Sequence, residues 1–234
     1  MNAINLKIVR YSYPDGTHAL RKINLKVPVG QSIAILGPNG SGKSTFAMHL
    51  NGAIENKESE INIMGLKLNK ENLTEIRSRV GLVFQDPDDQ LFCPTVFDDV
   101  AFGPINMGFS PEETEKIAMR AMKKAGVLHL KDSSPQHLSV GEKKRISIAT
   151  VLAMDSEILV LDEPTANMDG RGKRELAELL KQLPQTKVIA THDLDFAGWL
   201  TQRSIILHKG RIVEDEPTKK LLKDKKLLYD YGLL

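Results

Sequence analysis

A glycine-rich run directly after a short apolar segment constrains the fold of this chain more than any other feature. Residues 32–36 (Ser-Ile-Ala-Ile-Leu) have the pattern of a strand buried on both faces. Residues 37–45 (Gly-Pro-Asn-Gly-Ser-Gly-Lys-Ser-Thr) match G-x-x-x-x-G-K-[ST], and a predicted helix over residues 44–51 stops at Gly52. This strand, loop and helix predict a phosphate-binding loop in an α/β fold.

Each residue type in the loop suits the binding of a nucleotide's phosphates. Glycines let the backbone curl so that several N–H groups point into one concavity, and the helix N-terminus adds unpaired N–H groups. Lys43 would supply a full charge to the β- and γ-phosphates, and Ser44 would offer a hydroxyl to Mg²⁺. The predicted ATP-binding residues of the loop are Gly37, Pro38, Asn39, Gly40, Ser41, Gly42, Lys43, Ser44 and Thr45.

Further apolar runs indicate a mainly parallel sheet. Residues 80–84, 158–161 and 188–190 are short continuous apolar segments, and helical patterns lie between them. Apolar and polar residues instead alternate over residues 4–8 (Ile4, Leu6 and Ile8) and 23–27, which predicts an antiparallel pair of half-buried strands at the start.

The stretch from residue 88 to 155 is different, because it is mostly helical in pattern. Ser110 has the features of an N-cap, with Pro111 in the first helical position and Glu113 at the third. Residues 204–215 are predicted to form a hairpin. We expect a single domain with a core of residues 1–87 and 156–217, a helical subdomain of residues 88–155 and a tail of residues 218–234.

Charge and composition limit the classes of partner. The net charge of +2 argues against nucleic acid as a partner, and the lysines of the tail are interpreted as the solvated face of a short helix. Cys93 is the single cysteine, which excludes an internal disulfide and fits a reducing compartment. The chain shows neither a signal peptide nor an apolar run near the roughly 20 residues that span a bilayer, so any membrane link should go through another protein.

Two carboxylates follow the apolar run at residues 158–161. Ligands of open α/β sheets bind at the carboxyl ends of the strands, so Asp162 is expected to reach the Mg²⁺ region. Glu163 should point elsewhere and polarise an attacking water, since phosphoryl transfer depends on positioning and charge neutralisation.

Residues 138–145 (Leu-Ser-Val-Gly-Glu-Lys-Lys-Arg) have two compatible interpretations. Ser139 and Glu142 can form a capping box at a helix start, and the segment also resembles the Leu-Ser-Gly-Gly-Gln signature of ABC ATPases. Gln85 lies between the loop and this segment, and His192 follows the last apolar run. Five elements in this order resemble the ABC ATPase set, and the resemblance covers nearly the whole chain.

The resemblance implies catalytic and metal-binding roles at the matching positions. Glu163 would be the general base, His192 the γ-phosphate switch, and Gln85 would touch Mg²⁺ or the water. The implied catalytic residues are Glu163, His192, Gln85 and Lys43, and the implied Mg²⁺ ligands are Ser44, Gln85 and Asp162. Tyr13 is the candidate to stack on adenine, with Tyr11 as the alternative, and either ring could instead only pack.

In this family the signature completes the ATP site of a second chain. Ser139, Gly141 and Glu142 would therefore act on the ATP of the opposite subunit, and Asp169 would lie at the dimer seam. The pair would be a homodimer or a heterodimer with a paralogous ATPase. The chain departs from the family at three positions. Val140 stands where glycine is usual and is not counted as a direct contact, and Glu142 replaces glutamine. Met168 replaces a common leucine.

A finer resemblance concerns energy-coupling-factor (ECF) importers, which work with integral membrane transport components. Residues 11–20, 84–104, 141–145 and 191–196 resemble their ATPase subunits, most closely those serving cobalt or nickel uptake, although vitamin importers share most of these motifs. The resemblance implies a peripheral ATPase on the cytoplasmic face of the cell membrane. The transported ion should not bind this chain, because the sequence has no His/Cys/Asp cluster.

The same resemblance places the segment after Gln85 against the membrane partner. Asp88, Asp89, Asp98 or Asp99 would pair with arginines of its coupling helices, or would instead cap helices of the lobe. Two rival classes are soluble ABC proteins acting on DNA or ribosomes, which usually carry coiled-coil insertions or two ATPase domains, and exporter subunits.

Overall fold

Two sheets form the core of the protein, and the computed structural model describes residues 1–55 and 59–234. In this described part, the larger sheet has six strands in the order β10-β9-β3-β8-β7-β6. These strands are β3 (Ser32–Leu36), β6 (Val80–Val83), β7 (Ile158–Asp162), β8 (Thr186–Thr191), β9 (Arg203–His208) and β10 (Arg211–Pro217). The smaller sheet contains β1 (Asn2–Ser12), β2 (His18–Pro28), β4 (Glu60–Ile63) and β5 (Leu66–Lys67) in the order β2-β1-β4-β5.

The predicted parallel strands are confirmed. β3 pairs in parallel with β8 and β9, and β7 pairs in parallel with β8 and β6. Every residue of β3, β6, β7 and β8 is buried, as continuous apolar runs require when both faces of a sheet are covered. The hairpin of β9 and β10 and the antiparallel pair of β1 and β2 are also confirmed, while the predicted burial of Ile8 lies outside the described side chains.

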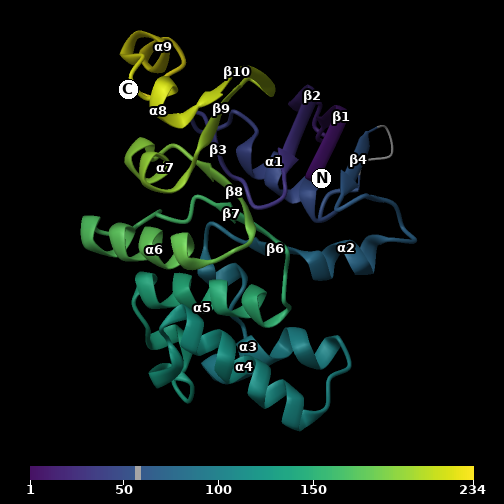
Figure 1. Ribbon diagram of the computed structural model, residues 1–234, viewed down its shortest axis with the longest axis vertical. Helices are drawn as coiled ribbons and strands as arrows, with labels where there is room; N and C mark the ends of the chain where they lie inside the picture. Colours follow the sequence, from purple (N-terminus) through teal and green to yellow (C-terminus); the bar gives the residue numbers. More distant parts are fainter. Residues whose placement is uncertain (56–58) are drawn as a thin grey trace.

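The two faces of the six-stranded sheet pack against different elements. Val160 lies in one cluster with α1 (Lys43–Leu50) and the antiparallel sheet. Its neighbour Leu161 lies in another cluster with α6 (Gly170–Gln182) and α7 (Leu194–Leu200), because successive side chains of a strand point to opposite faces. Figure 1 shows α6 and α7 on one side of the strands and α1, β1 and β2 on the other.

A helical lobe lies below the sheet in Figure 1 and has a hydrophobic cluster of its own. The lobe contains α3 (Val96–Asn106), α4 (Pro111–Ala125) and α5 (Val140–Ala153), with short 3₁₀ turns at Pro87–Asp89, Leu128–Leu130 and Pro135–His137. The capping box at Ser110 is present as predicted, with the Glu113 carboxylate accepting the Ser110 N–H at 3.0 Å. The proposed boundaries of core, lobe and tail stay a prediction.

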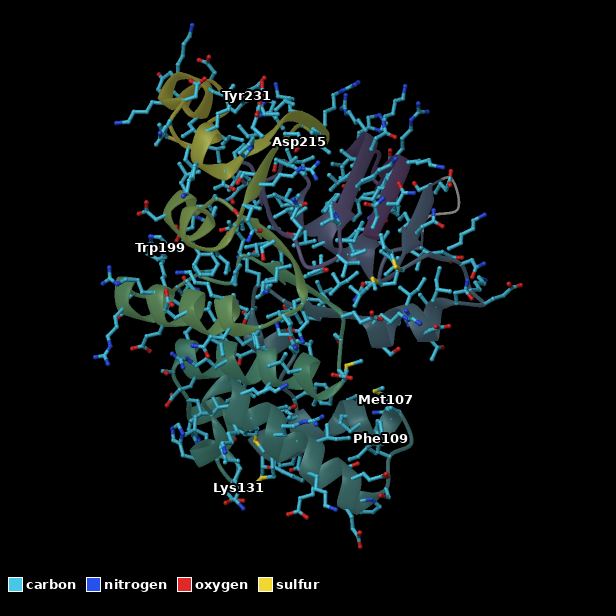
Figure 2. The ribbon with its side chains drawn as sticks, viewed as in Figure 1. Met107, Phe109, Lys131, Trp199, Asp215 and Tyr231 are labelled. Carbon is cyan, nitrogen blue, oxygen red and sulfur yellow. The ribbon has the colours of Figure 1, made fainter. Side chains whose placement is uncertain are left out.

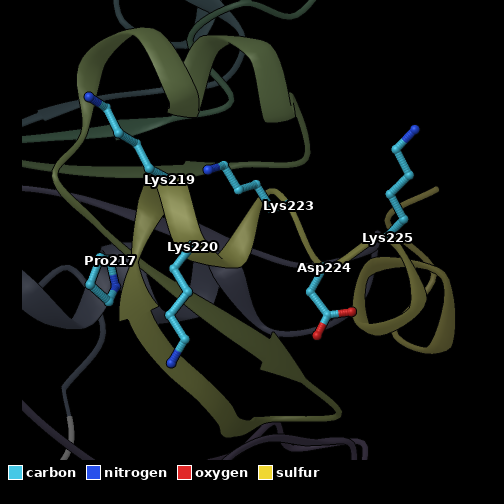
Figure 3. Close-up of a pocket in the computed structure, with 6 residues that line it drawn as sticks. All are labelled: Pro217, Lys219, Lys220, Lys223, Asp224 and Lys225. Carbon is cyan, nitrogen blue, oxygen red and sulfur yellow. The ribbon is translucent and has the colours of Figure 1, made fainter.

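The remaining helices are short. α2 (Leu73–Arg79) precedes β6, and the tail forms α8 (Thr218–Leu221) and α9 (Lys225–Asp230). Leu221 and Leu228 of the tail are buried beside β3 and β9, while its lysines are exposed, which confirms a solvated face. Figure 3 shows four of these lysines, Lys219, Lys220, Lys223 and Lys225, around a pocket at the carboxyl end of β10. In the part of the chain that the structure describes, none of the helices has the length and apolarity to span a bilayer.

The single cysteine lies where α3 begins. Its N–H and that of Phe92 both donate to the same carboxylate oxygen of Asp99, at 3.0 Å each. Burial and the carboxylates of Asp99 and Asp98 raise the pKa of the Cys93 thiol to about 11. The thiol is therefore expected to stay protonated at neutral pH.

Alkylation of Cys93 by iodoacetamide tests this arrangement. Only the thiolate reacts, so at pH 8 the folded chain should react on the order of 100-fold more slowly than the chain unfolded in guanidinium, where the thiol titrates near 8.5. The rate of the folded chain should keep rising about tenfold per pH unit from pH 7 to 9, since the raised pKa lies above that range. A mass-spectrometric time course measures both, and equal rates in the two states would contradict the placement of Asp99.

Candidate functional site

The order of the strands brings the predicted site residues to one edge of the larger sheet. β8 lies between β3 and β7, and all three run parallel. The glycine-rich loop follows β3, Glu163 follows β7, and His192 follows β8, so the three segments meet at the carboxyl ends of the strands. Gln85 follows β6, which borders β7 on its other side.

The loop has the backbone geometry of a phosphate cradle. Gly42 has φ +106°, and a Cβ there would lie 2.5 Å from the carbonyl oxygen of Ala19, so only glycine fits. A Cβ on Gly37 would clash with the carbonyl of Leu207. α1 begins at Lys43 with no side-chain cap, which leaves its first N–H groups available to an anion.

Lys43 points back into the loop and is nearly fully buried. Its Nζ donates to the carbonyls of Gly37 at 2.8 Å and Pro38 at 3.3 Å, and it forms an ion pair with Glu163 Oε1 at 3.2 Å. Both side chains of this pair are 6% exposed. The loop lysine and the predicted general base therefore share one buried space.

Glu163 is held by the end of the neighbouring strand. Its Oε2 accepts from the hydroxyl of Thr191 at 3.0 Å and from the backbone N–H of His192 at 3.3 Å. The His192 Nδ1 lies 3.0 Å from Glu163 Oε1, and the His192 side chain is 60% exposed. Glu163 also has φ +40°, a left-handed conformation that is uncommon for a residue with a Cβ and is often found at functional sites.

Sequence reasoning missed Thr191, which is completely buried and orients the carboxylate. Its position directly before His192 at a strand end was the one available signal. The arrangement gives a carboxylate of fixed orientation, with an exposed imidazole beside it, next to a lysine that can bind phosphate. Such a group can orient and polarise a water molecule attacking a phosphoryl group.

Asp162 and Ser44 fit a magnesium ion. Both predicted ligands lie together, since the Ser44 side chain is close enough to the Asp162 carboxyl to affect its pKa. Burial raises the pKa of Asp162, and the Ser44 side chain and the charge of Lys43 oppose that rise. Within the described residues, Asp162 Oδ1 is buried without a hydrogen-bond partner, as expected of an oxygen suited to a hard cation. Gln85, the third predicted ligand, is exposed nearby, and its side chain forms no hydrogen bond to any described residue.

The two tyrosine candidates have different surroundings. The Tyr13 hydroxyl lies 2.9 Å from Thr45 Oγ1 in the loop, and its ring is 37% exposed. Tyr11 instead packs against the buried core and meets His49 edge-to-face with ring centroids 5.0 Å apart. Tyr13 meets Tyr11 edge-to-face, also at 5.0 Å, but it is the more exposed of the two beside the loop, and its stacking on adenine stays a prediction.

The signature residues form the predicted capping box at the start of α5. The Glu142 carboxylate accepts from the Ser139 hydroxyl at 2.6 Å and the Ser139 N–H at 2.9 Å, and these bonds lower the pKa of Glu142. Gly141 faces Met168, and Asp169 caps α6 by accepting the Gly172 N–H at 2.7 Å.

These segments lie apart from the chain's own phosphate loop. In the described part, no hydrogen bond or ion pair joins residues 139–142 to residues 37–45, and Figure 1 shows α5 in the lobe and α1 across the sheet. Ser139 and Asp169 are both exposed. The signature residues are therefore free to meet a second molecule.

A buried lysine of α5 also faces the site. Lys144 is 1% exposed, and burial lowers the pKa of its ammonium group to about 8. The carboxylates of Asp86, Asp162 and Glu163 act in the opposite direction. The sequence shows this residue only as one of three consecutive basic residues.

Comparisons with known proteins agree with this geometry. A family model described as "ABC transporter" matches residues 20–166. A putative ABC transporter ATP-binding protein of Geobacter sulfurreducens is 46% identical over 96% of this chain and 90% of its own length. An energy-coupling factor transporter ATP-binding protein EcfA of Methanocaldococcus jannaschii is 43% identical over 96% of this chain and 82% of its own.

Solved structures show the same architecture. CbiO1 from Clostridium perfringens, part of the ABC transporter complex CbiONQ, superposes with a TM-score of 0.87 at 37% identity, covering 99% of this chain and 95% of that one. The ATP-binding cassette MJ0796, solved as a dimer in a post-hydrolysis state with ADP and Pi, gives a TM-score of 0.81 at 30% identity over 92% and 98%.

Asp162→Asn tests the proposed metal site. An amide oxygen is a weaker ligand for a hard cation than a carboxylate, so Mg²⁺ should no longer raise nucleotide affinity, a loss of about tenfold. Affinity for ATP in EDTA should stay near that of the original chain. Titration of a fluorescent ATP analogue with and without Mg²⁺ measures both, and Asp86→Asn serves as a control. An undiminished Mg²⁺ effect in Asp162→Asn would remove Asp162 from the metal site.

Proposed function

Because this chain belongs to the ABC transporter family of ATP-hydrolysing cassettes, of the energy-coupling-factor type, we propose that it powers import of Co²⁺ or Ni²⁺ from the cytoplasmic face of the cell membrane. The cluster of Lys43, Glu163 and Thr191, all buried, with the exposed His192 beside them at the phosphate loop, carries the proposal of hydrolysis. The similarity to EcfA and to CbiO1 supports an importer. The motifs shared with cobalt and nickel subunits support the choice of ion.

In the proposed reaction each site residue has one task. The loop backbone and Lys43 bind the phosphates, and Tyr13 stacks on the adenine. Ser44 and Asp162, with Gln85, hold Mg²⁺, which when bound neutralises charge on the β- and γ-phosphates. Glu163 accepts the proton of the attacking water, while Thr191 and His192 keep its carboxylate oriented.

The proposed active form is a dimer. Ser139, Gly141 and Glu142 would reach the ATP of the second subunit, and Asp169 would lie at the seam between the chains. The exposure of Ser139 and Asp169 and the separation of the signature from the chain's own loop support this. So does the dimeric MJ0796 cassette, although the second chain here is proposed as either a copy or a paralogous ATPase.

The lobe carries a surface suited to a membrane partner. Exposed apolar side chains gather on and around α3, where Phe92 and Phe102 meet edge-to-face at 5.0 Å. The exposed members are Phe92, Phe102, Ile105, Met107 and Phe109. Figure 2 shows Met107 and Phe109 at the outer side of the lobe. Exposed apolar side chains gathered in this way are typical of a protein–protein interface.

The structure reduces the number of acidic side chains that could pair with arginines of this partner. Asp99 is 4% exposed and binds two backbone N–H groups, so the expectation that it could pair with a partner's arginine is wrong. Asp98 accepts from Thr95 at 2.6 Å, and Asp88 accepts from Lys143 at 2.7 Å. Asp89 is exposed and has no hydrogen bond or ion pair through its side chain within the described residues, which makes it the strongest candidate.

Glu163→Gln tests the proposed general base. The amide cannot accept the water's proton, so phosphate release should fall at least about 100-fold while ATP still binds. ATP should then hold two chains together, which size-exclusion chromatography detects. Glu157→Gln, at an exposed carboxylate just before β7, should behave like the original chain. Undiminished hydrolysis by Glu163→Gln would exclude Glu163 as the base.

Charge reversal at Asp89 tests the membrane surface. The tagged chain is purified from native membranes in mild detergent, and co-purifying proteins are identified by mass spectrometry. Asp89→Lys should lose most of the integral membrane partners and still bind ATP, because Asp89 lies outside the loop. Asp132→Lys, at an exposed acid elsewhere in the lobe, should keep them.

The same purification tests the importer itself. Recovery of integral membrane proteins supports it. The identity of the substrate-binding component then distinguishes metal uptake from vitamin uptake. Recovery of only soluble partners or nucleic acid would contradict it.

A further inference from the structure

Three consecutive basic residues follow the signature, and each binds a different partner. Lys143 pairs with Asp88 in the turn after Gln85 at 2.7 Å, and Arg145 pairs with Glu175 of α6 at 2.7 Å. Lys144 lies between them and donates to the carbonyls of Phe84, at 3.2 Å, and Gln85. Consecutive residues of a helix point about 100° apart, so α5 contacts both residues 84–90 and α6 through these three side chains.

Lys144 differs from its two neighbours because it is buried and, among the residues that the structure describes, has no carboxylate partner within 4.0 Å. Its side chain is 1% exposed, whereas Lys143 and Arg145 form ion pairs with partly exposed acids. Burial of an ammonium group is costly unless hydrogen bonds satisfy it, and here backbone carbonyls accept them. These carbonyls belong to the segment that directly follows β6, so Lys144 binds the peptide groups on both sides of the Gln85 Cα.

A second side chain fastens the other end of the same segment. Gln90 accepts the Phe84 N–H at 3.2 Å, and its amide donates to the Ser147 carbonyl at 3.0 Å and the Thr150 hydroxyl at 2.8 Å. Ser147 and Thr150 both belong to α5. Residues 84–90 are thus attached to the signature helix at both ends, while the Gln85 side chain stays exposed.

We propose that Lys144 is a positioning residue that joins the backbone of Gln85 to the signature helix, so that the two ATP sites of a dimer respond to each other. The inference rests on the proposed function, in which Gln85 serves the chain's own ATP and Ser139 serves that of the second subunit. Both residues are then carried by one unit, the signature helix with residues 84–90. When one ATP site closes around its nucleotide, this unit moves, and with it the signature residues that complete the second ATP site.

Lys144→Met tests the coupling, because methionine fills the buried space and removes the donors. The variant is purified with the subunits that accompany the original chain. Binding of MgATP should change less than about twofold, since Lys144 does not touch the loop. The kcat should fall about tenfold or more, as displaced catalytic groups generally cause, and the Hill coefficient for ATP should drop from above 1 toward 1.

Lys143→Met is the matched control on the same helix. Its ion pair involves an Asp88 carboxylate that is 66% exposed, and exposed pairs contribute little, so kcat and Hill coefficient should stay near the original values. Gln90→Met removes the second attachment without touching a buried charge. It should reproduce the loss of cooperativity even if Lys144→Met fails to fold.

The outcomes separate the inference from the proposed function. If the original chain hydrolyses ATP cooperatively and the Lys144 and Gln90 variants are equally cooperative, the inference is overturned. The proposed function is not affected by that result. A loss of cooperativity equally large in Lys143→Met would overturn the inference as well. An original chain that neither hydrolyses ATP nor dimerises with its native subunits would overturn the proposed function itself.

Discussion

The buried ion pair between Lys43 and Glu163 is the contact on which the site depends. It joins the loop after β3 to the end of β7, across the intervening strand β8. Removing two charges from water is costly, and further hydrogen bonds to the lysine and to Glu163 Oε2 offset part of that cost. Gly37 and Pro38 accept from the lysine, and Thr191 with the His192 N–H donates to the carboxylate. The parallel order of β3, β8 and β7 makes all of these contacts possible.

The helical lobe provides the contact surfaces for other chains, apart from the residues that bind and hydrolyse ATP. Its helices bury their apolar side chains in a cluster of their own, so the lobe does not depend on the sheet for its core. It presents the signature at one end of α5 and an apolar surface around α3, and it meets the site through Lys144. Such a lobe can transmit movement between a partner and the ATP site without exposing the core of the sheet.

Local patterns explain how much of this could be predicted. β3, β6, β7 and β8 were recognisable because a strand buried on both faces needs a continuous apolar run. The capping boxes at Ser110 and Ser139 were recognisable because both partners lie within one helical turn. β4, β5 and α2 were not predicted, since they are short and β4 pairs with β1, which is distant in the chain. The burial of Asp99 was missed for a similar reason, because its carboxylate caps a loop that folds back onto α3.

The sequence by itself determined the phosphate loop and the likeness to an ABC ATPase. Glycine conformations, a lysine and a helix start are properties of neighbouring residues, and they act in the same way wherever the chain goes. Only the tertiary structure decided that Thr191 orients Glu163, that Tyr13 rather than Tyr11 has the exposed ring beside the loop, and that Lys144 reaches the carbonyl of Gln85. These contacts join segments far apart in the chain, and they depend on strand order and on the packing of α5, which no local propensity specifies.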